Sequence, residues 1–340
     1  MTPREDTGRL RTVTGTIATS DITGPVLSHE HLGMDLRWPA RPQLVESDPG
    51  RWLDEEKGVQ RELNELRKER GLGLVVDLTC SGMGRNAAAL ARVSAGSRVA
   101  VVAGTGVFTE PFYPAFVREA LAAGPGAGDS GGTSPQQELD GRSGVDRLAE
   151  RLLAEIGFGL DGTNALPGVI GEIGTWGEAP TEAEELCLRA AARAARYSGL
   201  SVATYGRAGL AQLEILTAAG LPADRVAVGQ QDRVDDPGQH RKIAESGAYV
   251  SFGTLGLAGE DHAAIGARVR AVMDLMEAGH ADRVLLSTGV SRMEQIVRYG
   301  GSGYGYLFDT FLPALRAAGA DDATLDTVLR DNPLRWLTAG

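Results

Sequence analysis

Short apolar segments recur along the 340-residue chain and alternate with segments that have helical periodicity. Apolar runs of this length are typical of strands buried in a parallel sheet. We expect strands at 25–32, 73–79, 98–104, 168–174, 200–205, 225–230, 248–253 and 283–288. We expect helices at 51–70, 87–95, 145–157, 181–197, 210–219, 238–246, 261–278 and 306–337. Eight strands that alternate with helices in one chain predict an α/β fold, a single-domain (β/α)8 TIM barrel.

The composition excludes several classes of partner. A formal net charge of −11 would repel a phosphate backbone, so nucleic acid is not expected to bind. The polar N-terminus does not read as a signal peptide, and no apolar run approaches the roughly 18 residues of a membrane span. We therefore expect a cytoplasmic protein without a membrane partner. Cys80 and Cys187 are the only cysteines, and we interpret them as free structural thiols.

One stretch interrupts the alternation of strands and helices. Residues 122–144 are rich in glycine and low in apolar residues, which predicts a flexible loop. The stretch is either a surface insertion or a lid over the site, and the sequence favours the insertion.

Two histidines and a glutamate stand out among the residues near the ends of the strands, where a barrel carries its chemistry. His29 and His31 lie two apart on the first strand and share one face, while Glu30 points away. Glu172 lies inside an apolar strand, where an ionised carboxylate costs several kcal/mol unless a metal, a cation or a proton compensates it.

Two interpretations of this buried carboxylate remain open. In the first, Glu172 joins His29 and His31 in a set that is able to hold one divalent metal. In the second, Glu172 forms a structural salt bridge, and its partner is one of three arginines, Arg85, Arg207 or Arg292.

Several motifs together resemble the phosphotriesterase-like branch of the amidohydrolase superfamily. They are Ser28-His-Glu-His-Leu32, Met83-Gly-Arg-Asn86, Gly168-Val-Ile-Gly-Glu-Ile-Gly-Thr175, Val228-Gly-Gln-Gln-Asp232, Gly300-Gly-Ser-Gly-Tyr-Gly-Tyr306 and Asp331-Asn-Pro333. The resemblance extends from about Gly15 to Leu337 and implies the same barrel fold. It also implies a binuclear metal centre, held by the strand-one histidines, a strand-four carboxylate, histidines after strands five and six, and an aspartate after strand eight.

The chain matches only half of the ligand set that the resemblance implies. His29, His31 and Glu172 match, whereas Tyr205, Gln230 and Gly289 stand where the other three ligands are expected. The sequence therefore predicts a degenerate centre without a cofactor. The alternative is a single divalent ion such as zinc, held by His29, His31 and Glu172.

The missing ligands limit the chemistry. Metal coordination lowers the pKa of water by up to roughly nine units, or about 12 kcal/mol, while acid–base residues typically contribute about 10² to 10⁴ in rate. Our first hypothesis is a small-molecule enzyme that catalyses a metal-independent elimination, isomerisation, cyclisation or rearrangement, or cleaves an activated ester or lactone. Glu172 and the histidines would move protons, while Tyr205 and Gln230 would donate hydrogen bonds to an oxyanion.

Two alternative functions stay open. They are a mononuclear metal-dependent hydrolase or lactonase, and a catalytically silent binding or scaffold protein. In each case the ligand is a small molecule, and the resemblance implies a homodimer. The residues that we expect to bind the substrate are Arg85, Phe108, Tyr113, Trp176, Arg207 and Arg292.

Overall fold

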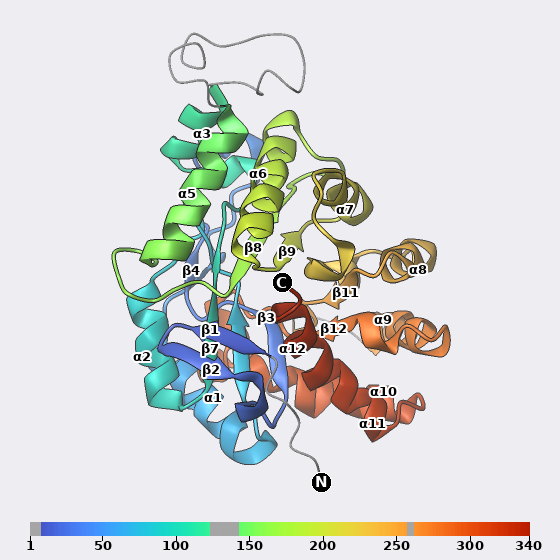
Figure 1. Ribbon diagram of the computed structural model, residues 1–340. Coiled ribbons are helices and arrows are strands. Elements are labelled where there is room, and N and C mark those ends of the chain that lie inside the picture. Colours follow the sequence, from blue (N-terminus) through green and yellow to red (C-terminus); the bar gives the residue numbers. More distant parts are fainter. Residues whose placement is uncertain (1–7, 123–142, 257–261) are drawn as a thin grey trace.

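The computed structural model describes residues 8–122, 143–256 and 262–340 and shows a (β/α)8 barrel, as predicted (Figure 1). Its parallel strands are hydrogen-bonded in the order of the chain. They are β3 (Val26–Glu30), β6 (Leu74–Asp77), β7 (Ala100–Thr105), β8 (Val169–Gly174), β9 (Val202–Tyr205), β10 (Val226–Val228), β11 (Tyr249–Phe252) and β12 (Val284–Leu286). Each of them falls within a predicted segment, except that β7 ends one residue later.

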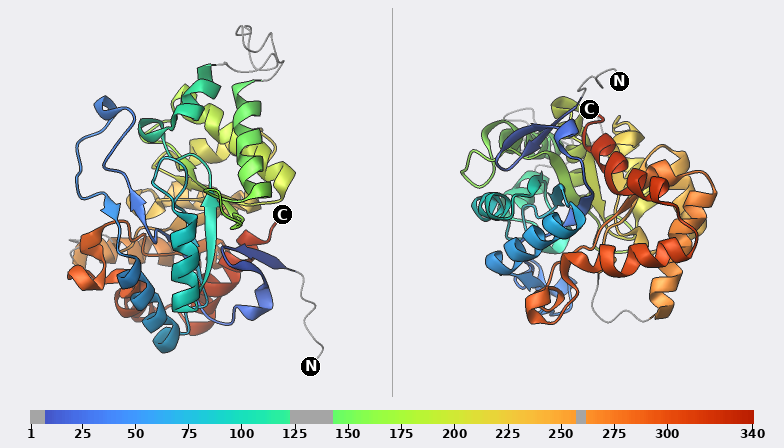
Figure 2. Two further views of the ribbon diagram at one scale, coloured as in Figure 1. Left: turned by 90° about the vertical axis from the view of Figure 1, so that its left-hand side faces the viewer. Right: turned by 90° about the horizontal axis from the view of Figure 1, so that it is seen from below.

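Helices surround the strands, and Figure 2 shows this arrangement along the barrel. They are α1 (Glu56–Arg70), α2 (Ala87–Ser97), α3 (Ala115–Ala122), α5 (Gly144–Phe158), α6 (Glu182–Ser198), α7 (Gly209–Ala218), α8 (Pro237–Glu245) and α9 (His262–Glu277). Among the described residues, no helix is long and apolar enough to cross a membrane. Cys80 and Cys187 are buried free thiols, as expected.

Two predicted helices differ from the structure. The helix predicted from Arg51 begins at Glu56, because Trp52–Leu53 form the short strand β5, which pairs with β4 (Met34–Asp35). The predicted C-terminal helix is interrupted at 318–321, between α10 (Leu312–Ala317) and α11 (Asp322–Asp326), and a π-helical turn joins α11 to α12 (Asn332–Leu337). Gly319 separates α10 from α11 with φ +112°, a left-handed conformation that ends a helix. Most of the loop predicted at 122–144 lies outside the described residues.

A hairpin that the sequence did not predict covers one end of the barrel. Strands β1 (Arg9–Thr12) and β2 (Gly15–Ala18) pair antiparallel, and they lie beside α12 in Figure 1. Leu10 packs there in one apolar cluster with Val26, Leu74 and Trp336. This cluster closes the N-terminal end of the strands, so the C-terminal end is left for the site.

A buried carboxyl group joins the first and last strands of the barrel. Glu30 Oε1 accepts hydrogen bonds from the Ser287 hydroxyl (2.6 Å) and from both the amide (2.7 Å) and the hydroxyl (2.6 Å) of Thr288, and Oε2 accepts one from the Val290 amide (2.9 Å). The side chain is fully buried. Burial raises the pKa of Glu30, and these hydrogen bonds oppose the rise. Glu30 therefore fixes the seam between β3 and β12.

We predict that Glu30→Gln destabilises the barrel by about 2–5 kcal/mol, because an amide nitrogen would face donors that now share a carboxyl group. Denaturant unfolding measures the change. The exposed Glu214 on α7 provides the control, and Glu214→Gln should stay within about 0.5 kcal/mol of the wild type. Equal stability of the two variants would contradict the role of Glu30 in the seam.

Candidate active site

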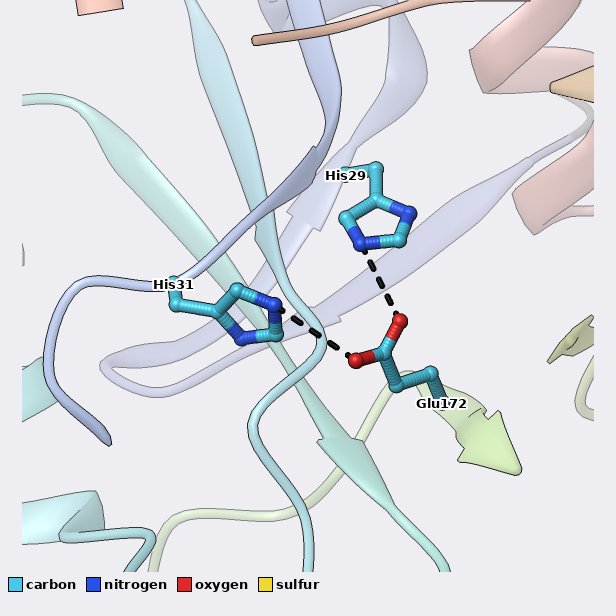
Figure 3. Close-up of side chains that lie close together, drawn as sticks. All are labelled: His29, His31 and Glu172. Carbon is cyan, nitrogen blue, oxygen red and sulfur yellow. Dashed lines mark ion pairs between the residues drawn. The ribbon is translucent and has the colours of Figure 1, made fainter. Parts of the chain in front are cut away.

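A cavity of about 420 Å³ lies at the C-terminal ends of the strands. Its wall includes His29 from β3, His31 just after β3, and Glu172 from β8. Glu172 lies between Ile170 and Ile173, where the pairing of β8 with β9 is irregular. The three residues are at most 4% exposed, and Figure 3 shows that their side chains point toward one another.

The carboxylate of Glu172 lies between the two imidazole rings. Its Oε2 lies 3.1 Å from His29 Nε2, and its Oε1 lies 3.5 Å from His31 Nε2. The rings are almost perpendicular, with centroids 5.6 Å apart. The two histidines are thus the neighbours of the Glu172 carboxylate, and the alternative of an arginine salt bridge is wrong. The three arginines considered for it pair elsewhere: Arg85 with Glu155 and Asp161, Arg207 with Glu178, and Arg292 with Asp48.

Neighbouring groups give the two histidines different properties. Burial lowers the pKa of His31 to about 4, and the charges of His29 and Arg51 add to this effect against the attraction of Glu172. Burial also opposes a charge on His29, but Glu172, together with the charges of Glu30 and Asp232, outweighs it and raises the pKa of His29. His31 Nδ1 lies 3.0 Å from the hydroxyl of Thr79, which orients the ring. The site therefore combines a neutral imidazole with one that pairs with a carboxylate.

The donor set fits one divalent metal ion. One ligand atom from each of His29, His31 and Glu172 lies within 4.8 Å of the others. Among the described residues, no second set of three His, Cys, Asp or Glu side chains comes together in this way. Glu172 Oε2 is buried and accepts no hydrogen bond from the described residues, so it has a free lone pair. Two imidazoles and a carboxylate suit zinc and similar ions.

The resemblance places three further residues of this chain at the other positions of the implied ligand set. Tyr205, Gln230 and Gly289 all line the same cavity. Gly289 has φ +63°, and a Cβ atom there would lie 2.6 Å from the carbonyl oxygen of Gly253. An aspartate therefore does not fit at position 289 without a backbone shift.

Tyr205 and Gln230 present hydrogen-bonding groups to the cavity. The ring of Tyr205, at the end of β9, packs edge-on against Phe108 with centroids 4.6 Å apart. Gln230 follows β10 and has φ +54°, a conformation that costs a residue with a side chain about 1 kcal/mol or more. Strained residues of this kind cluster at functional sites. Both residues are positioned to contact a molecule in the cavity.

Four of the six residues expected to bind substrate line the cavity, namely Phe108, Trp176, Arg207 and Arg292. Tyr113 is absent from the lining and is 1% exposed, because it packs in the core. Arg85 is also absent, which corrects the expectation that it binds substrate.

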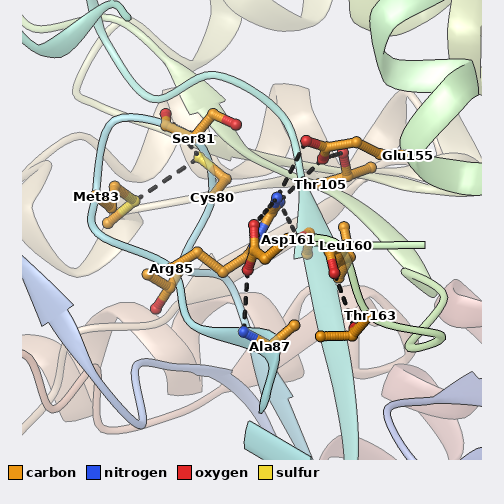
Figure 4. Close-up of polar contacts among 12 residues, drawn as sticks. Cys80, Ser81, Met83, Arg85, Ala87, Thr105, Glu155, Leu160, Asp161 and Thr163 are labelled. Atoms are coloured by element: carbon orange, nitrogen blue, oxygen red, sulfur yellow. Dashed lines mark hydrogen bonds and ion pairs between the residues drawn. The ribbon is translucent and has the colours of Figure 1, made fainter. Parts of the chain in front are cut away.

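Arg85 belongs instead to an ionic cluster with Glu155 and Asp161, in which the Arg85 side chain is 3% exposed whereas Asp161 is exposed (Figure 4). It lies 2.8 Å from Asp161 Oδ1 and 3.1 Å from Glu155 Oε2, and it donates a hydrogen bond to the Gly104 carbonyl oxygen. Glu155 also accepts a hydrogen bond from the Thr105 hydroxyl. Burial alone would lower the pKa of Arg85, but the two carboxylates raise it. The role of Arg85 is structural.

The sequence analysis missed several residues of the cavity. Asp48 and Arg51 come from the segment around β4 and β5, and Arg51 was assigned to the start of a helix. Arg233 comes three residues after Gln230, so its place after β10 was a signal that could have been used. Asp48 forms a two-point ion pair with Arg292, which lowers the pKa of Asp48.

Several known proteins are similar to this chain in sequence and in fold. The profile of the phosphotriesterase family matches residues 8–337. The phosphotriesterase homology protein of Escherichia coli is 33% identical over 93% of this chain and 98% of its own. An N-acetyltaurine hydrolase of Danio rerio is 26% identical over 97% and 98% of the two chains. The crystal structure of a lactonase from Listeria monocytogenes has a TM-score of 0.80 and 26% identity over 97% of this chain and 99% of its own.

We predict that Arg85→Met destabilises the fold by about 3 kcal/mol, because it leaves Glu155 and Asp161 unpaired. Denaturant unfolding measures this loss, and binding of ligands in the cavity should not change. Arg92 on α2 is 57% exposed and pairs with Glu56, so Arg92→Met is the control and should leave the stability close to that of the wild type. Weaker ligand binding by a folded Arg85→Met protein would restore a role in the site.

Proposed function

The chain belongs to the phosphotriesterase family, and on that premise we propose that it is a small-molecule hydrolase that cleaves a lactone or an activated ester. The observation that carries this proposal is the buried cluster of His29, His31 and Glu172 at a cavity with Tyr205 and Gln230 in its wall. The relatives support it, because N-acetyltaurine hydrolase and lactonase are both names of enzymes that hydrolyse carboxylic acid derivatives.

Each residue of the site has a role in such a reaction. A water molecule attacks the carbonyl carbon, and its proton passes to the carboxylate of Glu172 or to the neutral imidazole of His31. The hydroxyl of Tyr205 and the amide of Gln230 donate hydrogen bonds to the oxyanion that forms. When the carbon–oxygen bond breaks, the leaving oxygen takes up a proton from the His29–Glu172 pair.

One divalent ion fits at His29, His31 and Glu172, and it would polarise a carbonyl and ease the ionisation of water. The positions of Tyr205, Gln230 and Gly289 offer a phenol, an amide and a backbone without a side chain. These groups do not complete a second metal site. We therefore propose that the centre is degenerate and holds at most one ion.

A second candidate is a reaction that needs only proton transfer, such as an elimination or an isomerisation. The observation that favours it is the asymmetry of the histidines, since a neutral His31 and a carboxylate-paired His29 provide a base and an acid in one cavity. This candidate requires no metal ion.

Metal analysis and a substrate panel test the proposal together. Protein purified without added metal or chelator should contain no more than one equivalent of zinc or manganese, and it should hydrolyse members of a panel of γ-lactones, δ-lactones and aryl esters. Glu172→Gln should lower turnover at least about 10²-fold, with an equal or higher melting temperature. Two equivalents of metal would contradict the degenerate centre. Turnover that survives Glu172→Gln would contradict the mechanism.

We predict that Tyr205→Phe lowers turnover by about 10- to 10³-fold, because it removes one donor to the oxyanion and almost no volume. Steady-state kinetics on a lactone that the wild type hydrolyses measures the change. Tyr197 on α6 is 77% exposed, so Tyr197→Phe is the matched control and should keep full activity. If both variants keep full activity, the Tyr205 hydroxyl does not take part in the reaction.

A further inference from the structure

The wall of the cavity is rich in arginine although the chain is acidic. The net charge of the chain is −11, yet four arginines line the cavity, Arg51, Arg207, Arg233 and Arg292. The carboxylates in the same wall are Asp48, Glu172 and Glu178. An arginine that has no carboxylate partner is free to bind an anionic ligand. The pairing of each arginine shows where such a ligand would bind.

Two of these arginines already have carboxylate partners. Arg292 forms two hydrogen bonds with Asp48, and Arg207 lies 3.3 Å from Glu178. Within 8–122, 143–256 and 262–340, no carboxylate lies within ion-pair distance of Arg51 or Arg233, and neither guanidinium donates a hydrogen bond to the protein. These two side chains retain unsatisfied donors that face the cavity.

The half-buried Arg51 is held in place. Its guanidinium carbon lies 5.0 Å from the ring centroid of Trp176, a cation–π contact that orients the planar group. Trp176 is itself fixed, because its ring packs against Phe112 and its amide donates a hydrogen bond to Glu184. The backbone of Arg51 accepts a hydrogen bond from Leu36. The guanidinium is thus preorganised to bind an anion with two donors.

Arg233 lies at the rim of the same cavity. Its amide donates a hydrogen bond to the Gln230 carbonyl oxygen, so the exposed side chain starts close to a proposed oxyanion donor. An anion held between Arg51 and Arg233 would lie in the cavity that also contains Glu172.

We propose that Arg51 and Arg233 form a subsite for an oxyanion, and that the substrate is a lactone or ester with a carboxylate or phosphate substituent. The reacting group rests on the proposed function, whereas the binding of the anion does not. A guanidinium binds both kinds of oxyanion through paired N–H donors.

Calorimetric titration of the full-length protein with inorganic phosphate, and separately with acetate, tests the subsite and distinguishes the two sources of the anion. Arg51→Met should weaken binding of the preferred anion by about 10- to 100-fold, because it removes a charged hydrogen-bonding partner. Arg51→Lys keeps the charge without the planar pair of donors and should fall between the wild type and Arg51→Met. Binding that is absent in the wild type, or unchanged in Arg51→Met, would overturn the proposal.

Arg37 provides a matched control. It also lies over a tryptophan, with its guanidinium carbon 4.4 Å from the ring centroid of Trp52, but it pairs with Asp35 and is outside the cavity lining. Arg37→Met should bind phosphate and acetate like the wild type. An equal loss of binding in Arg37→Met would show that the effect of Arg51→Met is not local, which would also overturn the subsite.

A pair of substrates extends the test to catalysis. For a γ-lactone with a carboxylate side chain and for its methyl ester, we expect the wild type to prefer the charged compound by at least about tenfold in kcat/KM. Arg51→Met should abolish this preference. Equal rates for the two compounds in the wild type would contradict the substrate class. If neither compound is hydrolysed but anion binding depends on Arg51, the proposed reaction fails and the subsite is supported.

Discussion

The hydrogen bonds of Glu30 close the barrel, and the geometry of the site depends on them. One buried carboxyl group joins β3 to Ser287, Thr288 and Val290 next to β12. The residues on either side of Glu30 are the two histidines of the cavity. Because side chains alternate along a strand, fixing Glu30 in the seam directs both histidines to the opposite side, toward Glu172. Glu30 thus contributes both to closure of the barrel and to the orientation of the two histidines.

Two glycines near the last strands, Gly253 and Gly289, also shape the cavity. A Cβ atom at Gly253 would lie 2.7 Å from His29 Nδ1, so the ring of His29 occupies space that a side chain would otherwise take. Gly289 likewise leaves no room for a side chain near Gly253 and Thr254. At these two glycine positions the chain contributes no side chain to the cavity, whereas Tyr205 at the end of β9 and Gln230 after β10 do.

The sequence predicted the barrel and its reactive cluster because both follow from local patterns. Apolar runs defined the strands, and the spacing of His29 and His31 placed both side chains on one face. The sequence did not reveal which charges meet in space. Arg85 forms ion pairs with Glu155 and Asp161, which are 70 and 76 residues away in the sequence. The sequence analysis placed Arg51 in a helix because the charges that follow it have helical spacing. In the structure, the short strand β5 lies between Arg51 and the start of α1.

Arg51 and Arg233 lie on connecting segments, whereas Glu30, His29 and Glu172 lie on strands of the barrel. Loop positions tolerate replacement better than core positions, because few buried contacts depend on them. The groups proposed to recognise the substrate can therefore change during evolution without disturbing barrel closure or the reactive cluster.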